Sequence, residues 1–346
     1  HFMMKEIHEQ PKAVEDTLRS VCTDGSIDLE KTGLTRDAVA SFRQVWVIGC
    51  GSAYHVGVAA QYVLEDLAKI PVRVELASEF RYRDPLVPEN TLVVIISQSG
   101  ETADSLAALR KAKEQGAKTL AIVNVVGSTI AREADYVFYT LAGPEIAVAT
   151  TKAYSAQLLA IYALAIAFAQ DRGKLTDDQA AALVRELEAL PGKMERLLED
   201  EARIQWFASK QIAAKDIFFI GRGLDYAISL EGSLKMKEIS YIHSEAYAAG
   251  ELKHGTISLI EPSTLVVGVL TQQKLYEKTL SNLLECKTRG AYLMALTTYG
   301  NYSMEDNADF VLYIPKTDPH FAPSLAVIPL QLLGYYVSVA KGLDVD

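Results

Sequence analysis

The amino-acid sequence predicts an α/β protein made of two similar doubly wound parallel-sheet domains in tandem, each a three-layer α/β/α arrangement. One observation is a set of apolar runs, five to eight residues long, rich in Val, Ile, Leu and Phe and bounded by Gly, Ser or Asn. Such runs are typical of strands buried on both faces of a parallel sheet. The other is that helical stretches separate the runs, among them residues 103–117, where Gly116 ends the helical pattern.

An internal repeat sets the number of domains at two. Four apolar runs occur twice in the same order, and the second copy lies about 173 positions after the first. Each copy begins with a strand that ends in a Gly-x-Gly turn, with Tyr54 or Tyr226 three residues beyond the second glycine. The paired runs are VWVIG and IFFIG, TLVVIIS and TLVVGVL, KTLAIVN and AYLMALT, and ADYVFYT and ADFVLYI.

Charge and cysteine content restrict the class of protein. The chain has 346 residues, with 34 Lys and Arg against 44 Asp and Glu, and a net charge of −10. This acidic balance disfavours non-specific nucleic-acid binding, which needs a basic surface. The three cysteines, Cys22, Cys50 and Cys286, fit neither a disulfide framework nor a metal cluster. We therefore expect no metal and no other cofactor.

The sequence also predicts a cytoplasmic protein that does not enter the membrane. No signal peptide is recognisable, because charged residues interrupt the first apolar stretch. Residues 156–169 are the most apolar segment, but they are too few to span a bilayer. We predict that they form a buried helix.

Five segments make up the predicted domain organisation. The linker should hold two helices broken at Pro191-Gly192, because proline disrupts a helix interior. The first 21 residues predict one short amphipathic helix. We expect both helical regions to serve packing only. In order, the segments are an inter-domain segment (1–38), the first domain (39–174), a helical linker (175–213), the second domain (214–340) and the start of a tail (341–346).

The residues after the strand TLVVIIS indicate a binding site. Ser97, Gln98, Ser99, Gly100 and Thr102 lie between this strand and a helix. Hydroxyls donate hydrogen bonds, a glycine lets the backbone approach a ligand, and a helix N-terminus attracts anions. Helix capping would explain one hydroxyl. Three hydroxyls and an amide at the carboxyl end of a strand predict a phosphate cradle that lacks a lysine.

The first glycine turn is less informative. Gly49-Cys50-Gly51 is similar to the start of a dinucleotide-binding fingerprint, but Tyr54 replaces the third glycine. The nearest acid, Glu79, lies beyond the next strand, so nicotinamide or flavin binding is disfavoured. Cys50 has no sequence neighbour that would activate a thiolate, and we predict a small core residue.

The second copy lacks the serine-rich segment, so the two halves are predicted to have different roles. Glu231, Lys235 and Glu238 lie at i, i+4 and i+7 on one face of a predicted helix. A polar-aromatic loop with His243 and His254 follows. The charges could form a surface salt-bridge ladder. Alternatively, a carboxylate beside an ammonium, with an imidazole in reach, could transfer protons at neutral pH.

Taken together, these motifs resemble the isomerase half of the glutamine–fructose-6-phosphate amidotransferase family over nearly the whole chain. The resemblance implies two sugar-isomerase (SIS) domains and the conversion of fructose 6-phosphate and ammonia to glucosamine 6-phosphate. It also implies a homodimer and a glutaminase domain, absent from this sequence, that supplies the ammonia. The motifs that carry it are GCGSAYHVG, ASEFRY, SQSGETADS, GPEIAVATTKAY, KEISYIHSEAYAAGELKHG and IPLQLLGYYVSVAKGLDVD.

The same resemblance implies a role for each site residue. Glu238 would move a proton between C1 and C2 of the open-chain sugar, and Lys235 would assist at the sugar oxygens. His254, lent by the other subunit of the dimer, would open the sugar ring, and Glu231 matches a further family residue. The residues that match the sugar-phosphate pocket and its wall are Gly51, Ser52, Ser97, Gln98, Ser99, Thr102, Val148 and Ala149.

The chain departs from the family pattern in two places, and two other functions compete. Ser52-Ala53 stands where the family often has Thr-Ser, which removes one hydroxyl contact to the sugar. The sequence starts at a His, as expected of a cut chain, and stops at Asp346, before the family's Schiff-base lysine.

Two alternative functions are considered. A free-standing SIS isomerase or fructosamine-phosphate deglycase fits the motif KEISYIHSEAYAAGELKHG less well than the amidotransferase family does. A hexose-phosphate sensor is weakened by the lack of a helix-turn-helix or basic segment.

Overall fold

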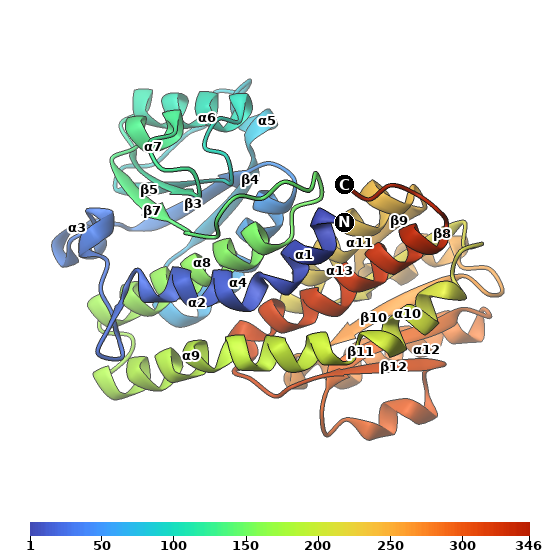
Figure 1. Cartoon of the computed structure of the whole chain (residues 1–346). Helices are drawn as coiled ribbons and strands as arrows, with labels where there is room; N and C mark the ends of the chain where they lie inside the picture. The colour runs from blue at the N-terminus through green and yellow to red at the C-terminus, as the bar shows by residue number, and fades with distance from the viewer. The chain divides into compact units, whose positions relative to one another are not determined.

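The computed structural model describes all residues from His1 to Asp346, and the chain forms two compact units. Unit 1 comprises residues 1–8, 146–151 and 192–346, and unit 2 comprises residues 9–145 and 152–191. Each unit holds one five-stranded, wholly parallel sheet with helices on both faces (Figure 1). The predicted fold class, two doubly wound α/β domains, is therefore confirmed.

The sheet of unit 2 has the strand order β4-β3-β5-β6-β7. Helices α4 (Ser52–Ala68) and α8 (Lys152–Asp171) cover one face. The short helices α5 (Ala77–Phe80) and α7 (Thr129–Glu133) cover the other face together with α6 (Ala103–Glu114). The strands are β3 (Gln44–Gly49), β4 (Val72–Leu76), β5 (Thr91–Ser97), β6 (Lys118–Val123) and β7 (Tyr136–Tyr139).

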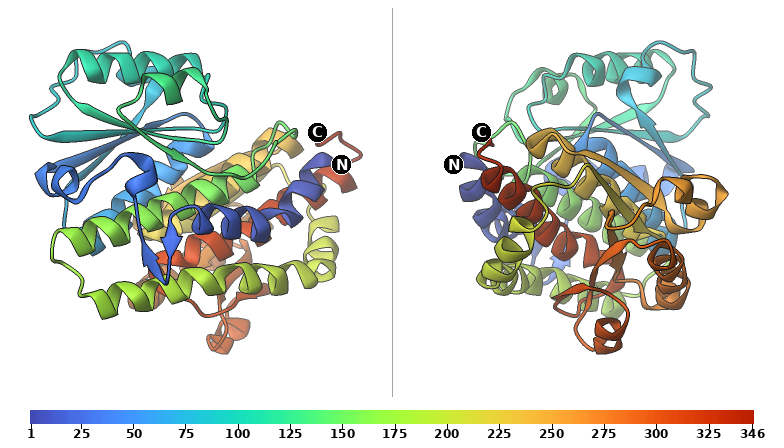
Figure 2. Two further views of the ribbon diagram at one scale, coloured as in Figure 1. Left: turned by 60° about the vertical axis from the view of Figure 1, so that its left-hand side comes forward. Right: turned by 90° about the vertical axis from the view of Figure 1, so that its right-hand side faces the viewer.

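The sheet of unit 1 has the order β9-β8-β10-β11-β12. Helices α11 (Leu224–Ser240) and α13 (Ala322–Ala340) cover one face, and α12 (Tyr276–Thr288) covers the other (Figure 2). Helices α1 (Phe2–His8) and α10 (Glu201–Ser209) pack on the outside of α13. The strands are β8 (Asp216–Gly221), β9 (His243–Ala248), β10 (Leu265–Leu270), β11 (Tyr292–Thr298) and β12 (Phe310–Ile314).

Strand order and local geometry both confirm the repeat. The two orders are identical when β9 is matched with β4. Helices α4 and α11 are both 17 residues long. Each follows a glycine with nearly the same positive φ, 55° at Gly51 and 59° at Gly223, a conformation that favours glycine. Each ends at a left-handed residue, Lys69 or Tyr241. A shift of 172 positions therefore superimposes the first helix of one copy on that of the other.

The predicted polar-aromatic loop is wrong in its first half. Residues His243–Ala248 form β9, which pairs only with β8 at the sheet edge. The sequence HSEAYA contains no apolar run, because an edge strand is only partly covered and tolerates polar side chains. The second half is helical, as η2 (Ala249–His254) and η3 (Thr256–Leu259).

Two helix boundaries also differ from prediction. Helix α9 (Asp177–Glu199) continues through Pro191, and the break lies at Asp200 instead. The opening segment forms two helices rather than one, because α2 (Gln10–Arg19) starts anew with Pro11 in its first turn, where proline needs no hydrogen-bond partner. The remaining short elements are β1 (Cys22–Thr23), β2 (Ser26–Ile27), η1 (Glu30–Thr32), α3 (Arg36–Ser41), η4 (Gln273–Leu275), η5 (Tyr302–Asp306) and η6 (Pro319–Phe321).

Two helices are long and apolar enough to cross a membrane, but both are core helices. In α8 and in the segment Pro319–Ala340, 94% and 89% of the most apolar window is buried inside the structure. The sequence-based prediction of a buried helix at residues 156–169 is confirmed, since these residues lie within α8.

Candidate functional site

The serine-rich segment of unit 2 forms a tight loop at the carboxyl end of β5. Ser97 is buried, and its Oγ accepts a hydrogen bond from the Gly100 N–H at 3.1 Å and lies 3.0 Å from Thr102 Oγ1. Ser99 Oγ accepts a hydrogen bond from the Glu101 N–H at 3.2 Å. Gly100 has φ +66°, and a Cβ there would lie 2.0 Å from Ser128 Oγ. The loop therefore depends on a glycine and presents several hydroxyls together.

Residues that follow the neighbouring strand, β6, hold this loop in place. The Asn124 N–H donates to the Gln98 carbonyl, and the Ile130 N–H donates to the Gly100 carbonyl, both at 3.0 Å. The Thr129 N–H donates to Glu101 Oε1 at 2.7 Å, which lowers the pKa of Glu101. These partners are not among the residues predicted from the sequence, although their place after a predicted strand at the same sheet edge is a usable signal.

The glycine turn before α4 lies at the same carboxyl edge of the sheet. Ser52 is buried in the first turn of α4, and Gly51 precedes it. Cys50 packs partly buried against the sheet core, with its Sγ 3.9 Å from Ser105 Oγ. Burial raises the pKa of the Cys50 thiol. A thiol with a raised pKa is a poor nucleophile at neutral pH, which agrees with the predicted core role.

The charged residues of α11 in unit 1 form a buried cluster. Lys235 Nζ lies 3.4 Å from Glu231 Oε1 and also forms an ion pair with Glu238. The side chains of Lys235 and Glu231 are 1% and 0% exposed, whereas that of Glu238 is 30% exposed. A surface salt-bridge ladder is therefore the wrong interpretation. Burial disfavours the ammonium, but the two carboxylates outweigh it, so the pKa of Lys235 is raised.

The two predicted wall residues, Val148 and Ala149, lie in the segment 146–151 of unit 1. Val148 is exposed and Ala149 is buried. The segment before them is fixed by Glu6 of α1, whose buried carboxylate accepts hydrogen bonds from the Ile146 N–H at 2.6 Å and the Ala147 N–H at 3.3 Å. The first helix therefore does more than pack, because it anchors a segment that contains two predicted site residues.

His254 does not join the cluster on α11. It is exposed at the end of η2, and no hydrogen bond or ion pair links it to Lys235 or Glu238. His243 instead pairs with Asp216 at 2.6 Å. Within one chain, the predicted carboxylate and ammonium are therefore in contact, but the predicted imidazole is not part of the group. Of the predicted residues, the cradle lies in unit 2, and Val148, Ala149 and the catalytic candidates lie in unit 1.

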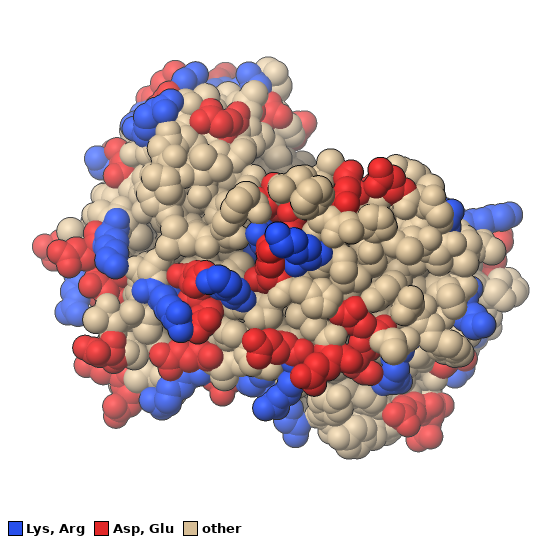
Figure 3. Space-filling model, in the orientation of Figure 1, with Lys and Arg blue, Asp and Glu red and all other residues tan.

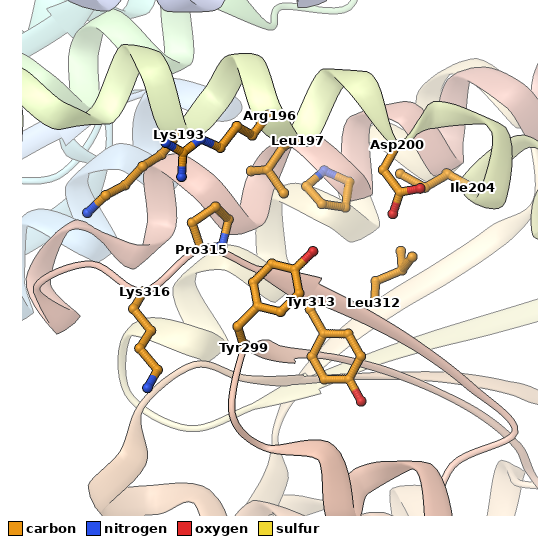
Figure 4. A pocket seen from close by; sticks show the side chains of 11 residues that line it. Lys193, Arg196, Leu197, Asp200, Ile204, Tyr299, Leu312, Tyr313, Pro315 and Lys316 are labelled. Atoms are coloured by element: carbon orange, nitrogen blue, oxygen red, sulfur yellow. The ribbon is translucent and has the colours of Figure 1, made fainter.

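A cavity of about 300 Å³ in unit 1 contains none of the predicted site residues (Figure 4). Its walls come from α9, α10, β12 and α13 and from the residues that follow β11 and β12. Tyr299 and Tyr313 stack there with ring centroids 5.5 Å apart. The other lining residues are Lys193, Arg196, Leu197, Asp200, Ile204, Leu312, Pro315, Lys316 and Pro329.

Comparison with known proteins shows which domain family the two copies represent. A family model described as the SIS domain matches residues 39–167 and 212–341. The chain belongs to the SIS-domain family. The first SIS domain, in unit 2, contains the predicted phosphate cradle, and the second SIS domain, in unit 1, contains the cluster of Glu231, Lys235 and Glu238 on α11.

The similarity extends beyond the single SIS domain. This SIS chain is 53% identical over its whole length to glutamine–fructose-6-phosphate aminotransferases (isomerizing) of Caldanaerobacter subterraneus subsp. tengcongensis and Clostridium tetani, and covers 57% of each. It matches the solved C-terminal domain of glucosamine-fructose-6-phosphate aminotransferase from Francisella tularensis with a TM-score of 0.96 and 41% identity, covering 100% of this chain and 98% of that one. The resemblance to this family is confirmed, and the chain spans less than two thirds of the curated relatives' length.

Proposed function

We propose that the chain is the sugar-phosphate isomerase part of a cytoplasmic glutamine–fructose-6-phosphate aminotransferase. It would convert fructose 6-phosphate and ammonia to glucosamine 6-phosphate, with the ammonia supplied by a glutaminase domain of the whole protein. The buried ion-pair cluster on α11 carries the proposal, because it holds the partly exposed carboxylate of Glu238 in a fixed position. The names of the full-length relatives support the same activity.

The phosphate group of the sugar would bind in the unit 2 cradle. Ser97, Ser99 and Thr102 supply hydroxyls and Gln98 an amide, and Gly51 and Ser52 lie at the N-terminus of α4, where backbone N–H groups attract anions. Neutral donors in a partly buried loop bind phosphate strongly, because hydrogen bonds to a charged group are stronger than neutral ones. Val148 and Ala149 would form the wall beside the reacting carbons.

Glu238 would act as the base. An aldose–ketose shift needs a group that removes a proton from one carbon and returns it to the next. The ion pair with Lys235 fixes the orientation of the Glu238 carboxylate, and the partial exposure of Glu238 leaves it accessible to a substrate. Lys235, which stays protonated between two carboxylates, would donate to the sugar oxygens. Anchoring the phosphate would supply the orientation that the proton transfer requires.

His254 would open the sugar ring in the site of a partner subunit, so the active form would be a homodimer. His254 is exposed on η2 and forms no hydrogen bond or ion pair with Lys235 or Glu238 of its own chain, which supports this arrangement.

We further propose that the SIS domains comprise residues 39–174 and 214–340 and that the linker comprises residues 175–213. On the face seen in Figure 3, Lys and Arg are interspersed with Asp and Glu, so this face offers no basic field for nucleic acid.

The proposal is tested by following proton exchange between fructose 6-phosphate and heavy water by NMR. We expect the chain to exchange the C1 proton and to isomerise the sugar, and Glu238→Gln to lose both. Glu195→Gln, on an exposed position of α9, is the matched control and should keep wild-type exchange. Undiminished exchange by Glu238→Gln would rule out Glu238 as the base.

A further inference from the structure

The second SIS domain contains a buried carboxylate at the carboxyl end of β10. Asp225, in the first turn of α11, is 1% exposed. Its Oδ2 accepts hydrogen bonds from the Thr271 N–H at 3.0 Å and the Gln272 N–H at 3.2 Å, and its Oδ1 accepts one from the Thr271 hydroxyl. The carboxylate of Asp225 therefore accepts hydrogen bonds from two backbone N–H groups and one hydroxyl of the loop that follows β10.

The repeat relates this loop to the cradle of the first domain. The shift of 172 positions that matches α4 with α11 places Ala53 opposite Asp225. The glycine turns agree, since a Cβ at Gly49 would lie 2.9 Å from the Ala53 carbonyl carbon and one at Gly221 would lie 2.5 Å from that of Asp225. The strand registers likewise match Thr271 and Gln272 with Gln98 and Ser99, two residues of the cradle.

The two domains therefore differ at this position of the helix as well as in the loop itself, where Leu270 and Leu275 replace the hydroxyl residues Ser97 and Thr102. In the first domain, position 53 is an alanine, which has no acceptor and leaves the loop donors to a ligand. In the second domain, the carboxyl group of Asp225 is the acceptor for donors of the corresponding loop. Carboxylate and phosphate oxygens have the same requirement for N–H and O–H donors.

We propose that Asp225 occupies, as an internal substitute, the oxyanion cradle of the second SIS domain, so that each chain binds phosphate only in its first domain. The inference rests on the proposed function in one respect, the phosphate site of the first domain. On this proposal the backbone N–H groups of Thr271 and Gln272, at the positions matched with the first cradle, are already satisfied by Asp225 and do not bind a sugar phosphate. Removing the carboxylate should make the second cradle available to a phosphate-sized oxyanion.

Equilibrium dialysis with radiolabelled inorganic phosphate tests this inference, at about pH 8, where carboxylates are ionised. We expect wild type to bind one phosphate per chain and Asp225→Ala to bind two. Asp225→Asn is the matched control, because its amide oxygen still fills the cradle, and should bind one. The reciprocal variant Ala53→Asp should bind none. One phosphate in both wild type and Asp225→Ala would overturn the inference.

Two further outcomes separate the inference from the proposed function. A wild-type chain that binds no phosphate would count against the proposed function, but a gain of one phosphate by Asp225→Ala would still support the inference. Circular dichroism shows whether Asp225→Ala folds. If it folds only when phosphate replaces chloride at equal ionic strength, the inference is supported. If it folds in neither and Ala53→Asp binds phosphate as wild type does, the inference is overturned.

Discussion

Asp225 illustrates how burial and hydrogen bonding compete at a single residue. Burial raises the pKa of its carboxyl to about 7, against the opposing effect of the hydrogen bonds from Thr271 and Gln272. In the unfolded chain the same group has a pKa near 3.8. The folded protein therefore binds this proton more tightly than the unfolded chain does. Folding becomes less favourable at pH values above 3.8, where the carboxyl of the unfolded chain has already lost its proton.

This linkage predicts a pH dependence of stability. Since the folded pKa is raised, the contribution of Asp225 is fully present below pH 3.8 and is lost as the pH rises to about 7. The free energy of unfolding of wild type relative to Asp225→Asn should therefore fall across this interval, by on the order of 3 kcal/mol. Urea unfolding of both proteins at several pH values measures the difference. A difference that does not change with pH would show that burial does not perturb the group.

At the scale of elements, the sequence predicts central strands and fails at edges and helix boundaries. The runs TLVVIIS and TLVVGVL are found as β5 and β10 because strands buried on both faces must be apolar. Strand β9 has no such run, because it lies at a sheet edge. Helix α9 passes through Pro191 although proline disfavours a helix interior, which shows that tertiary packing outweighs local preference.

Gly192, also within α9, provides a test of local preference. Its backbone is helical, and a Cβ there would meet no atom within 4 Å. We expect Gly192→Ala to raise the free energy of unfolding by about 0.5–1 kcal/mol, because alanine loses less backbone entropy on folding. Gly116→Ala is the control: its Cβ would be equally unobstructed, but φ is +81°, so it should destabilise by about 1 kcal/mol. Thermal melts compare the two, and destabilisation by both would contradict the argument.

For the site, the residue types and their helical spacing predict the shared face of α11, and the structure adds that Glu231 and Lys235 are buried. Burial of this kind could not be predicted, because α13 covers α11 and lies about a hundred positions away in the sequence. The role of Asp225 was missed for a related reason. Its partners, Thr271 and Gln272, become neighbours only when the sheet forms.

At the scale of the whole molecule, a shared active site predicts complementation between inactive variants. Glu238→Gln and His254→Ala should each be inactive alone. In a mixed dimer, one site would combine the intact Glu238 of one subunit with the intact His254 of the other. Random exchange of equal amounts should therefore restore about a quarter of wild-type isomerisation. If the mixture stays inactive although mass spectrometry shows mixed dimers, His254 acts within its own chain or not at all.

We propose that the first SIS domain binds the sugar phosphate and that the second performs the chemistry. Titration calorimetry of fructose 6-phosphate against Ser97→Ala and Glu238→Gln distinguishes these two roles. We expect Ser97→Ala to weaken binding about tenfold or more, because a hydrogen bond to a charged group is lost, while Glu238→Gln should bind as tightly as wild type. Unchanged affinity in Ser97→Ala, together with lost affinity in Glu238→Gln, would contradict the division of roles between the two domains.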